Sequence, residues 1–352
     1  MADMVSPPIS PIAQNGVLLH IGAFKTGTTS LQNSLAAVPV PLKESGVVAI
    51  GPPNWRGKLL TCREELSPRW RRAWSRIQQT SREHDGRLII SNENFCTATE
   101  VQAEKIRERL LPRDKVHILI TIRSLSDLLP STWQQLVKTA YGFVTPYEKW
   151  LRDVVDNYPS RELKFWSRND YPRVLRDWGV WGDQANVTVV MVDRSAPERA
   201  SRVTEKLLDL PDQTLSPQSG QKANWSQSYA EAELLRLVKA ENSDFSKREY
   251  RRFLRFGMSN HMRKQQGKQS IPLPDWARTA MLPLARAMID EFREAQIPVL
   301  GDIEELAETN VEVGDVPDLE TLPTSLVVAG MSGLAQSAAK TQRKLRAPKV
   351  EK

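Results

Sequence analysis

The sequence predicts an α/β protein in which a central parallel sheet is flanked by helices. Four short apolar runs are nearly continuous rather than alternating, which is typical of strands buried on both faces; they span residues 17–21, 88–90, 116–122 and 187–192. Segments with helical spacing lie between them, at 30–37, 105–111 and 128–140. The chain has 352 residues, of which 40% are hydrophobic, enough for a large core. Strands that alternate with helices indicate a doubly wound sheet.

The rest of the chain divides into a further helical region and two ends of different composition. Apolar residues at helical spacing predict helices from Ala230 onward and over 276–292. Residues 1–14 are an N-terminal extension, and 15–300 are expected to form one domain. After Gly301 the chain is acidic and poor in aromatic residues, and it ends in a basic tail, so we expect residues 301–352 to be partly disordered.

Charge and cysteine content limit the kinds of ligand and compartment. Lys and Arg number 49 against 42 Asp and Glu, a net charge of +7, which favours anionic ligands. Cys62 and Cys96 are too few for a disulfide framework or a paired-cysteine zinc site, so we expect a reducing compartment and no metal. The first residues carry no signal-peptide pattern, and no apolar run reaches the ~18 residues that span a bilayer. The sequence predicts a cytoplasmic protein.

The segment HIGAFKTGTTS, residues 20–30, lies between the first predicted strand and the helix after it. Gly22 and Gly27 allow tight turns, so that successive backbone N–H groups can face one phosphate. The N-terminus of the helix adds the positive end of its dipole. The hydroxyls of Thr28, Thr29 and Ser30 are placed to cap the helix and to donate to phosphate oxygens. The segment therefore predicts an anion-binding loop.

The position of the lysine in this loop separates two classes of enzyme. In the loop that binds nucleotide triphosphates the lysine follows the second glycine, whereas here Lys25 precedes Gly27, which argues against a magnesium-dependent kinase. The string HIGAFKTGTTSLQ instead resembles the 5′-phosphosulfate-binding loop of sulfotransferases, in a bacterial branch of that family. The resemblance implies the donor 3′-phosphoadenosine 5′-phosphosulfate (PAPS), bound by Lys25, Thr26, Gly27, Thr28, Thr29 and Ser30.

A second candidate phosphate site follows the predicted strand 116–122. Arg123 leaves the end of that strand and Ser131 follows eight residues later on a predicted helix, for which Asp127 is a candidate cap. A guanidinium fork and a hydroxyl can close on one dianion. In sulfotransferases an Arg and a Ser at this spacing hold the 3′-phosphate of the donor, and Arg123 and Ser131 match both. Two phosphate sites imply a bisphosphorylated adenosine.

The acceptor needs a base, and Glu93 is the first candidate. It follows the predicted strand 88–90, at the edge where ligands bind in open α/β sheets. The segment ISNENF resembles family members that use a glutamate. His20, at the end of the first strand, is the alternative base, and a helix-capping role for Glu93 after Asn92 stays open. The resemblance also gives Lys25 a catalytic role, because a cation stabilises charge on the leaving group.

The resemblance covers about residues 15 to 300 and implies a P-loop-like three-layer sandwich for this sulfotransferase domain. It favours bacterial enzymes that act on carbohydrate or other polar acceptors, with neither a metal nor a specific nucleic acid as partner. Two other hypotheses stay open. One is a kinase with a degenerate loop, for which Asp193 is the candidate metal ligand. The other is a non-catalytic polyanion-binding protein that uses two basic, aromatic-containing stretches, 63–82 and 247–268, which are equally typical of amphipathic helices.

Overall fold

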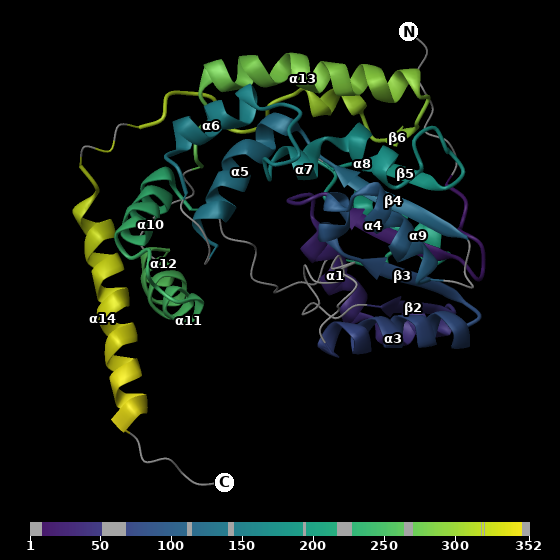
Figure 1. Ribbon diagram of the computed structural model, residues 1–352, viewed down its shortest axis with the longest axis horizontal. Helices are drawn as coiled ribbons and strands as arrows, with labels where there is room; N and C mark the ends of the chain where they lie inside the picture. The colour runs from purple at the N-terminus through teal and green to yellow at the C-terminus, as the bar shows by residue number, and fades with distance from the viewer. Residues whose placement is uncertain are drawn as a thin grey trace. The chain divides into compact units, whose positions relative to one another are not determined.

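The computed structural model describes residues 9–50, 68–110, 115–139, 144–192, 195–216, 227–263, 270–317, 319 and 321–346 (Figure 1). Cys62, Asp193 and the segments 63–67 and 264–268 of the two basic stretches lie outside these residues. The elements in chain order are β1 (Val17–Gly22), α1 (Thr28–Ala37), α2 (Pro39–Glu44), β2 (Val47–Ile50), α3 (Pro68–Glu83), β3 (Arg87–Ser91), the 3₁₀-helix η2 (Glu93–Thr97), α4 (Glu100–Glu108), β4 (Val116–Ile122), α5 (Leu125–Val137), α6 (Tyr147–Asp156), α7 (Trp166–Asn169), α8 (Tyr171–Asp177), β5 (Val187–Met191), α9 (Arg199–Leu208), α10 (Tyr229–Glu241), α11 (Lys247–Glu249), the π-helix η3 (Tyr250–Met258), α12 (Ser259–Met262), α13 (Asp275–Glu294), β6 (Val299–Leu300), the 3₁₀-helix η4 (Ile303–Leu306) and α14 (Thr324–Arg346).

Six parallel strands form one sheet in the order β2-β3-β1-β4-β5-β6. The four strands predicted from apolar runs are confirmed as β1, β3, β4 and β5. The sequence does not predict β2 and β6, because β2 is partly exposed and β6 has only two residues. Helices flank the sheet on both faces, so the predicted α/β three-layer sandwich is confirmed.

On one face of the sheet, side chains from alternate positions of the strands form a hydrophobic core with the helices that cover them. Leu18, Ile89, Leu119 and Val190 come from four neighbouring strands and share one hydrophobic cluster with α1, α2 and α9. The helices contribute residues one turn apart, as in Leu31 and Leu35 of α1. Strand residues on the opposite face are equally buried, which explains the nearly continuous apolar runs in the sequence.

A buried carboxylate ties α9 to the loop that follows it. Glu205 is fully buried, and its two oxygens accept hydrogen bonds from the backbone N–H groups of Leu215, at 2.6 Å, and Gln213, at 3.2 Å. Arg202, one turn earlier, pairs with the same carboxylate at 2.9 Å. Because the loop returns Leu210 and Leu215 to the core, this carboxylate fixes the packing of the α9 end of the cluster.

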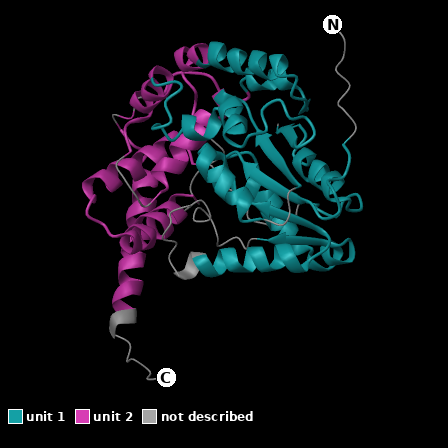
Figure 2. Cartoon of the chain, turned by 45° about the vertical axis from the view of Figure 1, so that its right-hand side comes forward, with its two compact units in different colours: residues 1–125, 157–221, 281–309 teal, residues 126–156, 222–280, 310–352 magenta. Residues whose placement is uncertain are grey.

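The chain divides into two compact units, which Figure 2 shows in different colours. The first comprises residues 1–125, 157–221 and 281–309 and contains the whole sheet; the second comprises 126–156, 222–280 and 310–352 and is helical. This division differs from the single domain 15–300 expected above. Apolar periodicity reports which residues are buried, and it does not report which core each helix joins.

The second unit has an aromatic core of its own. Trp133 of α5 lies 4.9 Å from Tyr147 of α6 and 5.9 Å from Tyr229 of α10, measured between ring centroids. The indole N–H of Trp133 donates to the carbonyl of Thr145. The consecutive helices α5 and α6 are thereby joined to α10, which is distant in the sequence, around one buried tryptophan.

The C-terminal region contains the 23-residue helix α14, Thr324–Arg346, while the expected partial disorder of residues 301–352 stays a prediction. Its alanine, serine and glycine residues have little apolar periodicity, so the helix is hard to detect in the sequence. Within the residues that the structure describes, α14 and every other helix are too short or too polar to cross a membrane.

Candidate functional site

The carboxyl ends of β1 and β4 mark the point where the direction of the chain across the sheet reverses. From β1 the chain proceeds to β2 at one edge of the sheet, whereas from β4 it proceeds to β5 on the other side. Ligands of open α/β sheets bind at such a switch point. The loop after β1 contains Lys25, and Arg123 directly follows β4, so both sequence-predicted cations lie at this edge.

The backbone of the loop between β1 and α1 has the geometry of an anion-binding turn. Lys25 has φ 65° and Gly27 has φ 84°, while Thr26 between them is not left-handed. Alternation of this kind turns successive N–H groups toward one point. Gly22 is required by space as well as by its φ of 107°, because a Cβ there would lie 3.1 Å from the backbone of Glu93. The loop therefore packs directly on the segment after β3.

Thr121 of β4 holds this loop in place by hydrogen bonds. The hydroxyl of Thr121 donates to the carbonyl of Gly22 at 2.9 Å and lies 2.6 Å from the hydroxyl of Thr26. The backbone N–H of Ala23 donates to the carbonyl of Thr121 at 2.7 Å. The side chains of Thr121, Thr26 and Ala23 are all buried. The contacts hold the loop to β4 as well as to β1.

Two hydroxyls of the loop are used differently from the sequence-based expectation. Thr26 and Thr28 both donate to the carbonyl of Ala23, at 2.7 and 3.1 Å, which satisfies this acceptor inside the loop. The N-cap of α1 is Gly27, without a side-chain cap, so the expected capping by Thr28, Thr29 or Ser30 is wrong. The side chain of Thr29 is half-buried and that of Ser30 is exposed. Because the hydroxyls of Thr26 and Thr28 already donate to Ala23, these two residues can donate to a ligand only through their backbone N–H groups.

Three cations gather at the loop, and the sequence points to only two of them. The pKa of Lys25 is lowered by partial loss of water around it and by the charges of Arg123 and Arg168. The guanidinium carbon of Arg168 lies 3.9 Å from the centroid of the Phe24 ring, and its buried Nε has no hydrogen-bond partner among the described residues. Desolvation lowers the pKa of Arg168 as well. An anion would relieve the mutual repulsion of this cluster.

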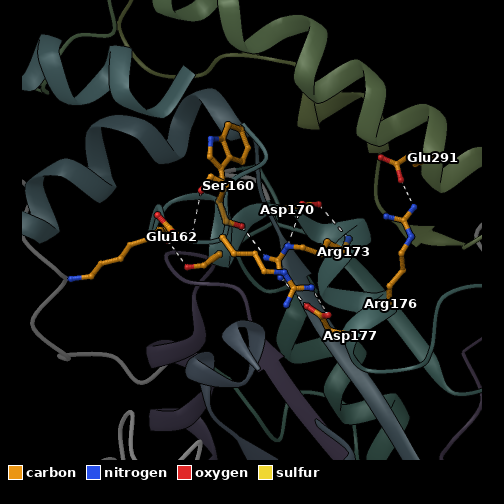
Figure 3. A network of polar contacts seen from close by, with 11 residues as sticks. Ser160, Glu162, Asp170, Arg173, Arg176, Asp177 and Glu291 are labelled. Carbon is orange, nitrogen blue, oxygen red and sulfur yellow. Dashed lines mark hydrogen bonds and ion pairs between the residues drawn. The ribbon is translucent and has the colours of Figure 1, made fainter. Parts of the chain in front are cut away.

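A polar network holds the short helix that carries Arg168 (Figure 3). The guanidinium of Arg173 pairs with Asp170 at 3.2 Å and Asp177 at 2.8 Å, and also donates to the carbonyl of Trp166 in α7. Arg161 pairs with Asp177 from the preceding loop at 2.7 Å. These side chains are mostly buried, so the ends of α7 and α8 are fixed against each other. The network therefore fixes the short helix that carries Arg168.

Glu93, the sequence-predicted base, lies beside the loop on η2. Its Oε2 accepts a hydrogen bond from Gln32 of α1 at 3.2 Å, and Gln32 also donates to the carbonyl of Ser91. The positive charge of Arg168 interacts with Glu93, and Glu93 favours the charged form of that arginine. Asn92 is the residue that caps η2, accepting from the N–H of Asn94. Glu93 is half-buried and is not the cap.

His20, the alternative base, is a fully buried member of the sheet. Its ring nitrogens lie 2.8 Å from the hydroxyl of Ser91 and 3.3 Å from that of Thr121. Burial lowers its pKa to about 4. The neutral ring of His20 on β1 lies between Ser91 of β3 and Thr121 of β4. Its contacts hold these three strands together where the loop begins.

Burial of His20 predicts a specific loss of stability in acid. The unfolded chain takes up its proton near pH 6.5, whereas the folded protein does so only near pH 4, so this contribution is complete above pH 6.5 and is lost as the pH falls to about 4. The loss corresponds to roughly 3 kcal/mol. Urea unfolding of the wild type and of His20→Gln at pH 7, 5.5 and 4.5 measures it as the difference between their pH dependences. Identical pH dependence in the two proteins would contradict it.

Ser131, the second predicted residue for the 3′-phosphate, lies in α5, where its hydroxyl donates to the carbonyl of Leu128 at 3.1 Å. Ser131 belongs to the second unit and Arg123 to the first, so their pairing stays a prediction from sequence spacing. Capping of α5 by Asp127, which lies in the first turn of that helix, stays a prediction. The carboxylate of Asp127 is buried inside the second unit and accepts from the N–H groups of Asn310 and Val311, at 2.8 and 3.1 Å.

The structure thus brings Lys25, Arg123 and Glu93 to one edge of the sheet and adds Arg168 and Gln32, which sequence reasoning missed. Gln32 ends the HIGAFKTGTTSLQ string, which was the available signal, whereas nothing in the pattern around Arg168 indicates a site. In the part of the chain that the structure describes, no group of three His, Cys, Asp or Glu side chains could hold a metal ion. Comparisons with protein-family models, with curated proteins and with solved structures found no match.

Proposed function

We propose that the chain is a sulfotransferase that moves a sulfuryl group from PAPS to a hydroxyl or amine of an acceptor. The observation that carries the proposal is the cluster of Lys25, Arg123 and Arg168 around a left-handed backbone turn, at the switch point of a parallel sheet. The string of residues 20–32 supports it from the sequence. A cytoplasmic location stays a prediction of the sequence alone.

The residues present fit a donor of this chemistry. PAPS has a phosphosulfate group and a 3′-phosphate, and when bound it supplies an activated sulfuryl group. Lys25 and the N–H groups of residues 26–29 would hold the phosphosulfate, with the hydroxyl of Ser30 as a further donor because its N–H already donates to Gly27, and Arg123 would pair with the 3′-phosphate. The buried Nε of Arg168 has no partner among the described residues and offers one more donor. Lys25, whose charge is disfavoured beside two arginines, gains most from an incoming anion.

Glu93 would act as the base. Gln32 holds Oε2, which leaves Oε1 to accept the proton of the attacking acceptor group. The carboxylate of Glu93 and the guanidinium of Arg168 attract each other beside the loop. Cys96 plays no part in proton transfer, because burial raises its pKa to about 12 and its thiol donates to the carbonyl of Glu93 at 3.0 Å.

Ligand-induced stabilisation tests the proposal. Thermal unfolding is followed while the wild-type protein is titrated with adenosine 3′,5′-bisphosphate and, separately, with ATP and magnesium. We expect the bisphosphate alone to stabilise the protein, by about 2.7 kcal/mol when it reaches 100 times its Kd. Glu93→Gln should be stabilised as much as the wild type, because the base contacts the acceptor. Equal or greater stabilisation by ATP with magnesium would replace the sulfotransferase with the kinase hypothesis.

A further inference from the structure

A basic groove lies within the second unit, far in sequence from the loop described above. Its volume is about 600 Å³, and its walls come from α11 and η3 on one side and α14 on the other. Eight residues line it: Lys247, Arg248, Arg251, Arg252, Phe256, Ser337, Lys340 and Thr341. Five of the eight are cationic and none is acidic. The groove is therefore a concentrated positive surface on one compact unit.

The sequence builds this groove by burying one side of η3 and exposing the other. Tyr250, Leu254 and Met258 point inward and are buried, so the amphipathic interpretation of this basic stretch holds for its inner side. Arg251 and Phe256 are exposed on the outer side. The stretch of residues 247–258 is thus both a packed helix and a charged wall.

The second wall is fixed by a close crossing of two helices. A Cβ on Gly333 of α14 would lie 2.5 Å from the carbonyl oxygen of Gly257, so only glycine permits this approach. Ser337 then donates to the carbonyl of Arg252 at 3.2 Å. One turn further along α14, Lys340 and Thr341 face the arginines of η3. The cations of the two walls are held together by backbone packing.

The lining residues select the class of ligand. Cations on both walls require a chain with several anionic groups, and the hydroxyls of Ser337 and Thr341 can bond to ligand hydroxyls. Phe256 is the one aromatic residue in the lining, and a single ring gives successive bases no stacking platform. The lining also has no amide or carboxylate side chain to read base edges.

We propose that this groove binds an acidic polysaccharide, whose sulfate or carboxylate groups pair with Arg251, Arg252 and Lys340. The site uses no residue of the loop after β1, so the proposal stands or falls separately from the transferase activity. Phe256, half-exposed at 50%, gives a sugar ring an apolar surface beside the charges.

Binding of a heparin decasaccharide to the full chain, followed by calorimetry at 0.1 and 0.3 M salt, tests the proposal. We expect binding that weakens steeply with salt and is about tenfold weaker in Arg251→Gln/Arg252→Gln. The matched control is Arg71→Gln/Arg72→Gln, which removes the same charge from two adjacent exposed arginines on α3 and should bind as the wild type does. Lys25→Ala should also bind normally. Lys340→Gln, on the opposite wall, repeats the test if the double variant does not fold.

Three results would overturn the proposal. One is the absence of heparin binding to the wild type at 0.1 M salt. Another is an equal loss in the α3 control, which would mean that net charge alone binds the polysaccharide. The third is tighter binding of a 20-nucleotide oligothymidylate that depends on Arg251 and Arg252, which would assign the groove to single-stranded nucleic acid.

Discussion

Lys25→Ala should weaken the binding of adenosine 3′,5′-bisphosphate by about 100-fold. The loss of one charge-assisted hydrogen bond in a partly dehydrated site reduces affinity by about this factor. Lys25 is the only cation of the cluster on the left-handed turn itself, so its charge cannot be replaced by Arg123 or Arg168 from neighbouring segments. The measurement is the Kd by calorimetry for the wild type and the variant.

The same substitution should leave folding intact, which separates lost binding from lost structure. Burial first, and then the positive charges of Arg123 and Arg168, lower the pKa of Lys25, so its removal relieves desolvation and repulsion and we expect stability that is unchanged or higher. Lys43→Ala removes an exposed lysine from α2 and is the matched control, with an unchanged Kd. A change of less than threefold for Lys25→Ala would remove this lysine from the site.

Glu205→Gln should lower the free energy of unfolding by roughly 3 kcal/mol, because it removes the charge of a buried carboxylate and turns one of its acceptor oxygens into a donor. The N–H groups of Gln213 and Leu215 would face an amide that offers a single oxygen, and the guanidinium of Arg202 would lose its buried counter-charge. The loop from Leu210 to Leu215 belongs to the same core cluster, so its displacement would loosen α9.

Urea unfolding measured by circular dichroism gives this value, and Glu198→Gln supplies the comparison. Glu198 pairs with the same arginine at 2.8 Å but is exposed, so its substitution should cost less than about 0.5 kcal/mol. Similar losses in the two variants would mean that the backbone contacts of Glu205 contribute little.

The sequence predicts the buried centre of this fold well and its periphery poorly. β1, β3, β4 and β5 are continuous apolar runs because both faces of the sheet are covered. β2 and β6 are short edge strands, four and two residues long, so their apolar runs are too brief to stand out in the sequence. α14 is missed because its packing depends on glycines that permit backbone contact, a property that hydrophobic periodicity does not report.

The candidate site is likewise predicted well where its residues follow buried strands and poorly where they do not. Lys25, Glu93 and Arg123 each follow a recognisable strand, so their place at one edge of the sheet can be inferred from the parallel topology. Arg168 arrives through a loop and the short helix α7, fixed by the pairs of Arg173, and no local pattern links it to the strands. The buried hydroxyl contacts of Thr26 and Thr28 depend on the shape of the loop, which spacing alone does not give.

The bond from Ala23 to Thr121 also sets an order of events during synthesis of the chain. Because β1 pairs with β4 about 100 residues later, a nascent chain that ends before residue 116 lacks the threonine that braces the loop. The first helix and the two strands of the β2–β3 side can associate earlier, but the loop acquires its final shape only when β4 leaves the ribosome. Competence to hold an anion therefore depends on residues as far along the chain as Arg168, although the loop itself is among the first segments to be made.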